Sequence, residues 1–251
     1  MDRMIYTAMS GAQQSFIRQA VVGNNLANVS TTGFRGQIEA MRAVPVQGDG
    51  TLRTRVSAMA TTPGSNFAPG PINATGRDLD VALEGGAWLA VQDENGKEAY
   101  TRRGDLQVDG NGMITSAGRP VIGEGGPIIV PLGAELTIGA DGTISAISPG
   151  DKPDALVQVG KLKLVTPDEK SLERGDDGLF RSLDANGNAV PLAADDNARL
   201  QTGALEGSNV SAVESMVDMI ATSRLYEMQM KAVQTSEDNA RQADRLLSLS
   251  A

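Results

Sequence analysis

Two amphipathic patterns, one near each end of the chain, constrain the fold more than any other feature of the sequence. Apolar residues recur at alternating steps of four and three from Ile5 to Leu26, and the same rhythm returns from Ala212 to Val233. Steps of four and three place residues along one face of an α-helix, as in the seam of a coiled coil. The sequence between the two segments carries no comparable pattern. We therefore expect a long helix near each terminus and a different kind of structure in the middle.

The N-terminal pattern ends abruptly. Its stripe runs through Ile5, Met9, Ala12, Phe16, Gln19, Gly23 and Leu26. Asn24, Asn25 and Asn28 then place amide groups on the last turns, and the Ser-Thr-Thr run that follows favours side-chain hydrogen bonds to the backbone over continued helix. Gly33 can adopt the positive φ that the exit from a helix often needs. We expect the helix to stop by residue 30 and the chain to turn there.

The C-terminal pattern opens with a recognisable start. Ser211 and Glu214 fit a capping box, in which the serine hydroxyl accepts a hydrogen bond from the amide three residues on. Pro and Gly are absent from residues 208–251, so one helix of about 38 residues, near 60 Å long at ~1.5 Å per residue, is expected. Its stripe consists of Ala212, Met216, Met219, Ser223, Tyr226, Met230 and Val233, widened by Val213, Val217 and Ile220.

The middle of the chain reads as short strands joined by tight turns. Asn95-Gly96, Asn111-Gly112, Asp141-Gly142 and Asn186-Gly187 are hairpin signals, because Asn, Asp and Gly tolerate positive φ. The content of 29 Gly with only 3% aromatic residues agrees with a structure rich in turns. Candidate strands between the turns are residues 88–92, 98–102, 127–130, 136–138, 143–147 and 156–165. An antiparallel β domain is therefore expected.

These elements define an α+β protein. A central, mainly antiparallel β domain is flanked by N- and C-terminal helices that pair as a coiled-coil-like stem. We assign residues 1–30 to the N-terminal helix of a helical core domain, 31–75 to an extended connector, 76–204 to the β domain and 205–251 to the C-terminal helix of the core domain. The connector is rich in Thr, Pro and Gly and has little periodicity.

The apolar stripes of the two helices need partners. Pairing them with each other would bury part of their surface at about 25 cal/mol per Å². Two arrangements remain open on this pattern alone: a stem closed within one molecule, or a stem whose remaining apolar surface is covered by other subunits.

Charge and composition exclude several classes of function. A formal net charge of −9 repels phosphate backbones and argues against nucleic-acid binding. The chain has no Cys, so disulfides and thiolate chemistry are not available to it. The first thirty residues lack the continuous apolar stretch of a cleaved signal peptide, and no apolar run reaches the ~18 residues of a membrane span. We expect neither a cleaved signal nor direct membrane insertion.

Particular residue runs add to these patterns. The chain opens Met1-Asp-Arg-Met-Ile-Tyr-Thr-Ala-Met-Ser-Gly11, continues with Asn24-Asn-Leu-Ala-Asn-Val-Ser-Thr-Thr-Gly-Phe-Arg35, and ends with Leu205-Glu-Gly-Ser-Asn-Val210 and Arg224-Leu-Tyr-Glu227. Between them lie Gly76-Arg-Asp-Leu-Asp-Val-Ala-Leu-Glu-Gly85 and Ala99-Tyr-Thr-Arg-Arg-Gly104. These runs, spread almost from end to end, resemble the flagellar rod and hook proteins.

The resemblance implies a structural subunit of the bacterial flagellar basal-body rod, which self-assembles through its terminal helices into the drive shaft that transmits torque. The opening residues favour the proximal-rod type, and a distal-rod or hook-like subunit is the alternative. The implied partners are other copies of the chain, other rod subunits and the flagellar type III export apparatus. The implied location is the rod where it spans the periplasm, reached without a cleaved signal peptide.

Residues on the two stripes and in the shared motifs are the expected assembly interface. They are Ile5, Met9, Phe16, Asn24, Asn25, Leu26, Asn28, Leu205, Asn209, Val213, Met216, Val217, Ile220, Tyr226 and Met230.

Enzymatic chemistry has little support in the sequence. The chain has no His and no Cys, which removes the commonest proton shuttle, metal ligand and thiol nucleophile. A carboxylate-dependent hydrolase of cell-wall glycan remains the enzymatic alternative, with Asp176-Asp177 and Asp195-Asp196 as candidate acids. The run from Asp184 to Asn188 is similar to the start of a calcium loop but lacks its Gly and its closing Glu, so we read it as a turn. No catalytic residue, metal or cofactor is predicted.

Overall fold

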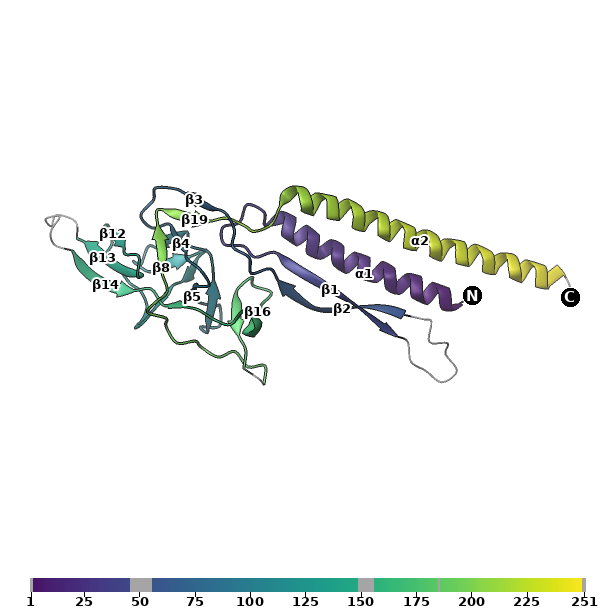
Figure 1. Cartoon of the computed structure of the whole chain (residues 1–251), viewed down its shortest axis with the longest axis horizontal. Helices are drawn as coiled ribbons and strands as arrows, with labels where there is room; N and C mark the ends of the chain where they lie inside the picture. The colour runs from purple at the N-terminus through teal and green to yellow at the C-terminus, as the bar shows by residue number, and fades with distance from the viewer. Residues whose placement is uncertain (1, 46–55, 149–155, 185, 250–251) are drawn as a thin grey trace. The chain divides into compact units, whose positions relative to one another are not determined.

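The computed structural model describes residues 2–45, 56–148, 156–184 and 186–249 (Figure 1). Contacts between residues divide the chain into two units. The helical unit comprises Met1–Val29, Gln37–Asn66 and Val210–Ala251, and the β unit comprises Ser30–Gly36 and Phe67–Asn209. The predicted α+β class is confirmed, because a helix near each terminus flanks a sequence of antiparallel strands.

Two antiparallel helices form most of the helical unit. Helix α1 spans Asp2–Ala27 and helix α2 spans Ala212–Leu249, and the two pack along each other (Figure 1). The Oγ atom of Ser211 accepts a hydrogen bond from the amide of Glu214 at 3.4 Å, which confirms the predicted cap of α2. Both predicted helices therefore form, with the predicted start and end.

Small side chains line the seam between α1 and α2. Helix α2 buries Ser215, Thr222 and Ser236, which are seven and fourteen residues apart, and helix α1 buries Ala8, Ala12, Ser15 and Val22. The seam is so close that a Cβ atom added to Gly11 would lie 3.0 Å from the Cδ atom of Gln229. Two of the buried hydroxyls bond within their own helices, since Ser15 donates to the carbonyl of Gly11 and Thr222 to that of Asp218.

The orientation of both helices differs from the predicted one. Among the predicted N-terminal stripe, only Ala12 is buried, and none of the predicted C-terminal stripe is. The helices are rotated so that a neighbouring line of smaller residues meets, because Ala and Ser let the two backbones approach closely. The predicted stem forms, but Met9, Phe16 and Met216 are exposed, and the other large apolar side chains expected at the seam are at most half-buried.

A β-hairpin completes the helical unit. Strand β1 (Gln37–Pro45) pairs antiparallel with β2 (Val56–Ser65), with a register shift between Ile38 and Ala40, and both strands lie against α1 (Figure 1). Sequence patterns indicated an extended connector over 31–75, of which 46–55 lies outside the described residues. The structure therefore has a hairpin where an extended connector was predicted. The hairpin is stabilised by pairing between its two strands and by packing on α1, and neither interaction produces a periodic pattern in the local sequence.

The largest sheet of the β unit has the strand order β15-β5-β6-β17-β16 and is antiparallel throughout. Its strands are β5 (Trp88–Gln92), β6 (Glu98–Thr101), β15 (Leu164–Val165), β16 (Leu172–Arg174) and β17 (Phe180–Ser182). A short 3₁₀ helix, Glu169–Ser171, precedes β16.

Smaller antiparallel sheets surround it. Two three-stranded sheets contain β7 (Leu106–Val108), β8 (Ile114–Ser116) and β9 (Arg119–Pro120), and β12 (Glu135–Ile138), β13 (Thr143–Ile147) and β14 (Val157–Lys161). Three strand pairs are β10 (Ile122–Gly123) with β11 (Gly126–Pro127), β4 (Val81–Leu83) with β18 (Leu200–Thr202), and β3 (Ile72–Ala74) with β19 (Ala204–Glu206). The predicted strand at 127–130 is mostly irregular, because after Pro127 only Ile129 forms a bridge, with Met113.

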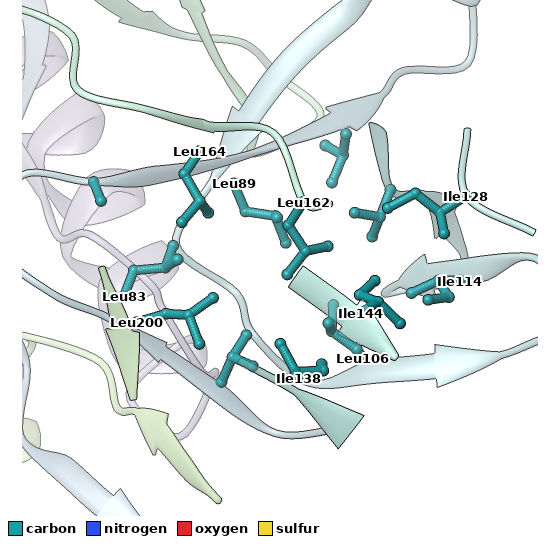
Figure 2. Close-up of a cluster of buried hydrophobic side chains, with 14 of the residues drawn as sticks. Leu83, Leu89, Leu106, Ile114, Ile128, Ile138, Ile144, Leu162, Leu164 and Leu200 are labelled. Carbon is teal, nitrogen blue, oxygen red and sulfur yellow. The ribbon is translucent and has the colours of Figure 1, made fainter. Parts of the chain in front are cut away.

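Large aliphatic side chains fill the core of the β unit. Leucine and isoleucine side chains from separate small sheets converge in one cluster, with Leu89, Leu106, Ile114 and Ile144 fully buried (Figure 2). A second cluster joins Trp88 and Phe180, whose ring centroids lie 4.8 Å apart. The many short strands are therefore held together by a shared core.

The predicted turns form by one recurring arrangement. In three of the four, an aspartate carboxylate accepts hydrogen bonds from amides two and four residues on, as Asp109 does from Asn111 and Met113, both at 2.8 Å. In the fourth, Asp141 accepts from the amide and the hydroxyl of Thr143. The glycine of the turn then takes a positive φ, which is 80° at Gly112. Asp184 uses its carboxylate in the same way, on the amides of Asn186 and Asn188, so the segment predicted as a turn is one.

Candidate assembly interface

A buried cluster of three charged residues lies in the β unit, and we call it the motif cluster. The carboxylate of Glu206 is 2.7 Å from a guanidinium nitrogen of Arg35 and 2.7 Å from one of Arg102, and all three side chains are only 2% exposed. Each residue comes from a different one of the sequence motifs quoted above. One carboxylate thus joins the segment that follows α1, the strand region of the β unit and the segment that precedes α2.

Neighbouring backbone groups bond to most of the remaining polar atoms of the cluster, and the Nε atom of Arg35 is buried without a hydrogen-bond partner. The guanidinium of Arg102 donates to the carbonyls of Leu83, Gly85 and Ala87, and Glu206 accepts from the amide of Gly70 at 2.9 Å. Burial lowers the pKa of Arg102, and the charge of Glu206 partly offsets this effect. Buried charges of this kind persist only when paired and hydrogen-bonded, so the cluster depends on all of its members.

Gly33 is required where the chain passes this cluster. Its φ is +66°, and its amide donates to the carbonyl of Glu206 at 2.8 Å. A Cβ atom at this position would lie 2.4 Å from the carbonyl carbon of Arg102, so no side chain fits. The predicted positive φ at Gly33 is confirmed, and the close approach explains why the motif has a glycine there.

The side chains of two asparagines predicted at the interface form hydrogen bonds to backbone groups of their own chain. In the helical unit, Asn25 donates to the carbonyl of Gln37 at 2.9 Å and accepts from its amide at 2.8 Å, so it pairs with that residue as a strand would. In the β unit, Asn209 accepts from the amide of Gly36 at 2.7 Å and donates to the carbonyl of Ala68 at 2.8 Å. These amides fix the course of the chain next to the helices.

The other motif residues have mixed positions. Asn28 donates to the carbonyl of Asn24 at 2.9 Å across one helical turn, and Asn24 itself is exposed. Leu26 is half-buried at the end of α1. Leu205 is half-buried in β19, where it pairs with Asn73 of β3.

Large apolar side chains are exposed on both helices. We define the α1 outward face as Tyr6, Met9, Phe16 and Ile17, and the α2 outward face as Val213, Met216, Val217 and Ile220. Phe16 is 65% exposed and Val213 is 73% exposed. Contiguous exposed apolar surface of this kind marks interaction sites.

Sequence reasoning found most, but not all, of these faces. It named Met9, Phe16 and the whole α2 outward face. It missed Tyr6 and Ile17, each of which directly follows a predicted residue. Of the remaining predicted residues, Tyr226 is 37% exposed, and Ile5 and Met230 are half-buried. It also did not single out Arg35, Arg102 and Glu206, although the motifs that contain them were the available signal.

Three of the four candidate acids of the enzymatic alternative, Asp177, Asp195 and Asp196, form hydrogen bonds or ion pairs in the structure. A hydrogen bond from Thr166, at 2.7 Å, and one from the amide of Asn197 lower the pKa of Asp195. A hydrogen bond from Arg181 lowers the pKa of Asp177. Asp196 lies 2.8 Å from the ammonium of Lys161. The pKa is thus lowered at Asp195 and Asp177, whereas a general acid in glycan hydrolysis requires a raised pKa.

Other site types are also lacking in the part of the chain that the structure describes. Its acidic residues form no group of three or more that could hold a metal ion. None of its helices is long and apolar enough to cross a membrane.

Three family models match successive parts of the chain. Residues 5–35 match a model described as flagella basal body rod protein, residues 82–146 match the flagellar hook protein FlgE/F/G D1 domain, and residues 201–246 match the flagellar basal body rod FlgEFG protein C-terminal model. The first model covers most of α1 together with Arg35, and the last covers most of α2 together with Glu206. The fold and the matches together define a subunit of the axial structure of the bacterial flagellum.

Full-length relatives narrow this class. The flagellar basal-body rod proteins FlgF of Escherichia coli and of Salmonella typhimurium are each 53% identical to the chain, with 100% of both chains covered. A rod protein FlgG of Borreliella burgdorferi is 31% identical over 95% of this chain and 96% of its own. The chain belongs to the flagellar basal-body rod protein family. It is a structural subunit of the flagellar basal body.

Proposed function

We propose that this subunit belongs to the proximal part of the rod and assembles through its terminal helices into the shaft that transmits torque. The observation that carries the proposal is the pair of outward faces on α1 and α2. The stem is already closed by small residues at its seam, yet large apolar side chains still lie on its surface. Two relatives named FlgF are 53% identical to the chain, whereas those named FlgG are 30–31% identical, which supports the proximal type over the distal-rod or hook-like alternative.

The physical argument concerns what can cover these faces. Apolar surface buried between subunits contributes about 25 cal/mol per Å², so the exposed side chains favour association. Met9 and Met216 are flexible and can adapt to neighbours that are not equivalent to one another. In this proposal, residues 1–30 and 205–251 act as the assembling core domain, and their partners are other copies and other rod subunits.

We also propose that the protein is not a catalyst. Asp177, Asp195 and Asp196 form ion pairs and turn hydrogen bonds, which supports a structural role for them. The same proposal includes export through the flagellar type III apparatus without cleavage of a signal peptide, and a final position where the rod spans the periplasm. Secretion of full-length protein, with Met1 or Asp2 at its N-terminus by mass spectrometry, is the expected result.

The assembly role can be tested with polar substitutions on one outward face. We expect Met9→Gln together with Phe16→Gln to abolish swimming in soft agar, because neighbours lose the apolar contacts of α1. The variant should still be exported, and the purified protein should unfold at the same denaturant concentration as the unchanged protein, since both side chains are exposed.

Arg18→Gln is the matched control, because Arg18 is also exposed on α1 but is not part of the outward face. It should leave motility unchanged. Normal swimming by the Met9→Gln, Phe16→Gln variant would overturn the assembly role of this face.

A further inference from the structure

A cavity of about 550 Å³ borders the motif cluster in the β unit. Arg35, Arg102 and Glu206 all line it, and so do Trp88 and Phe67. Its volume falls within the ~300–1,000 Å³ that small-molecule sites occupy. One side of the motif cluster therefore faces a space that is large enough for a ligand.

The inner wall of the cavity carries an excess of positive charge. The guanidiniums of Arg35 and Arg102 share one carboxylate, that of Glu206, and all three side chains are only 2% exposed. The Nε atom of Arg35 has no hydrogen-bond partner among the residues that the structure describes. A buried donor without an acceptor and a buried charge without a counter-charge are both unfavourable. This wall therefore suits a carboxylate, whose two oxygens match the fork of a guanidinium.

The outer part of the cavity has the opposite charge. Glu84 and Glu169 line it, and both are exposed, which places them toward the solvent. A cationic group at this opening would pair with them. The remaining walls are largely apolar, because Trp88 and Phe67 line the cavity together with Ile72, which is 53% exposed.

Charge complementarity selects the class of ligand. An anion without a positive group would be repelled by Glu84 and Glu169, and a cation without a negative group would be repelled by the excess charge of the motif cluster. We propose that the cavity binds a zwitterionic peptide of about two residues with apolar side chains. Its carboxylate lies toward the motif cluster and its ammonium toward Glu84 and Glu169. Its apolar side chains lie against Trp88 and Phe67.

Trp88 can report binding, because it lines the cavity and the chain has 1 Trp. The purified protein is titrated with leucyl-leucine, which carries both charges, with N-acetyl-leucyl-leucine, which lacks the ammonium, and with leucyl-leucinamide, which lacks the carboxylate. We expect a saturable change in Trp88 fluorescence with leucyl-leucine. Each blocked peptide should bind at least about tenfold more weakly, because it loses charge-assisted hydrogen bonds. No saturable change with leucyl-leucine, or equal binding of the three peptides, would overturn the proposal.

Variants at the opening test where the ammonium binds and leave the motif cluster unchanged. Glu84→Gln together with Glu169→Gln should weaken the binding of leucyl-leucine about tenfold and should not weaken that of N-acetyl-leucyl-leucine. Glu94→Gln is the matched control, since Glu94 is exposed in the same unit but does not line the cavity, and it should leave both affinities unchanged. An unchanged affinity of the double variant for leucyl-leucine contradicts the proposed binding mode. The measurement uses unassembled protein, so its result does not depend on the proposed role in the rod.

Discussion

The seam between α1 and α2 is lined by Ala, Ser and Thr side chains, whereas the core of the β unit is filled by Leu, Ile and Val. The β unit places its large apolar residues inside and exposes few of them, and the helical unit does the reverse. The contrast indicates that the two units have different roles. The β unit is stabilised by its own core, and the apolar surface of the helical unit is available to bind other molecules. Substitutions in the two units should therefore have opposite consequences for folding and for assembly.

The largest effect is expected at the motif cluster. Glu206→Gln keeps the shape of the side chain but leaves the guanidiniums of Arg35 and Arg102 buried without a counter-charge. Breaking a buried ion pair in this way costs about 3–5 kcal/mol of the free energy of unfolding. Urea unfolding of the purified protein, followed by Trp88 fluorescence, is the measurement, since Trp88 is buried in the β unit. Glu135→Gln, at an exposed position of the same unit, should change nothing, and an equal effect of both variants would contradict the role of the cluster.

Core truncation tests the contrast directly. Leu89 is fully buried, so Leu89→Ala should lower the free energy of unfolding of the β unit by about 2–5 kcal/mol. Phe16→Ala removes a larger side chain from an exposed position and should change it by less than about 0.5 kcal/mol. The same Phe16→Ala variant should impair motility. Substantial destabilisation by Phe16→Ala in the monomer would mean that the α1 outward face is part of a core after all.

The sequence predicted the elements of the helical unit but not their orientation. Periodicity fixes where a helix begins and ends, and it correctly placed the end of α1 and the cap at Ser211. Hydropathy then assigned the largest apolar residues, Met9 and Phe16, to the seam. In the structure, Ala12 and Ser15 are buried instead, because small residues allow the two helix backbones to approach closely. No local sequence pattern tells whether a helix face is covered by the same chain or by another molecule.

In the β unit, sequence patterns predicted the turns but not which strands pair. Turn signals such as Asn111-Gly112 located the hairpins, because a positive φ is a local requirement that Asn and Gly satisfy. Sheet order, the β1–β2 hairpin and the motif cluster depend on residues far apart in the chain. Arg102 and Glu206 are 104 positions apart, and nothing near either of them indicates the other. The resemblance of motifs pointed to these segments, but only the structure shows that they share one carboxylate.

Acid should lower the free energy of unfolding by a smaller amount, mainly through carboxylates of the β unit. A hydrogen bond from Arg181 lowers the pKa of Asp177; for Asp93, burial alone would raise the pKa, but hydrogen bonds from Arg181 and two backbone amides lower it overall. A carboxyl whose pKa is lower in the folded state contributes stability above its unfolded pKa of ~3.9, and this stability is lost as the pH falls through the folded value. Asp177→Asn should therefore make the free energy of unfolding less dependent on pH below about pH 4. An unchanged pH dependence in urea unfolding from pH 2 to 6 would contradict this role of the Arg181 pair.

The smallest effect compares two glycines, one in each unit. Gly11 lies within α1, where alanine is favoured over glycine by about 1 kcal/mol, and the atoms nearest to a new Cβ are at the flexible end of the Gln229 side chain. Gly11→Ala should therefore raise the melting temperature of the helical signal in circular dichroism, by an amount equivalent to ~0.5–1 kcal/mol. Gly33→Ala should instead destabilise the β unit, because its φ is positive and a Cβ would meet the backbone of Arg102, which cannot move aside. Destabilisation by Gly11→Ala would show that Gln229 is held rigidly, and the seam would then be packed as tightly as the β core despite its small residues.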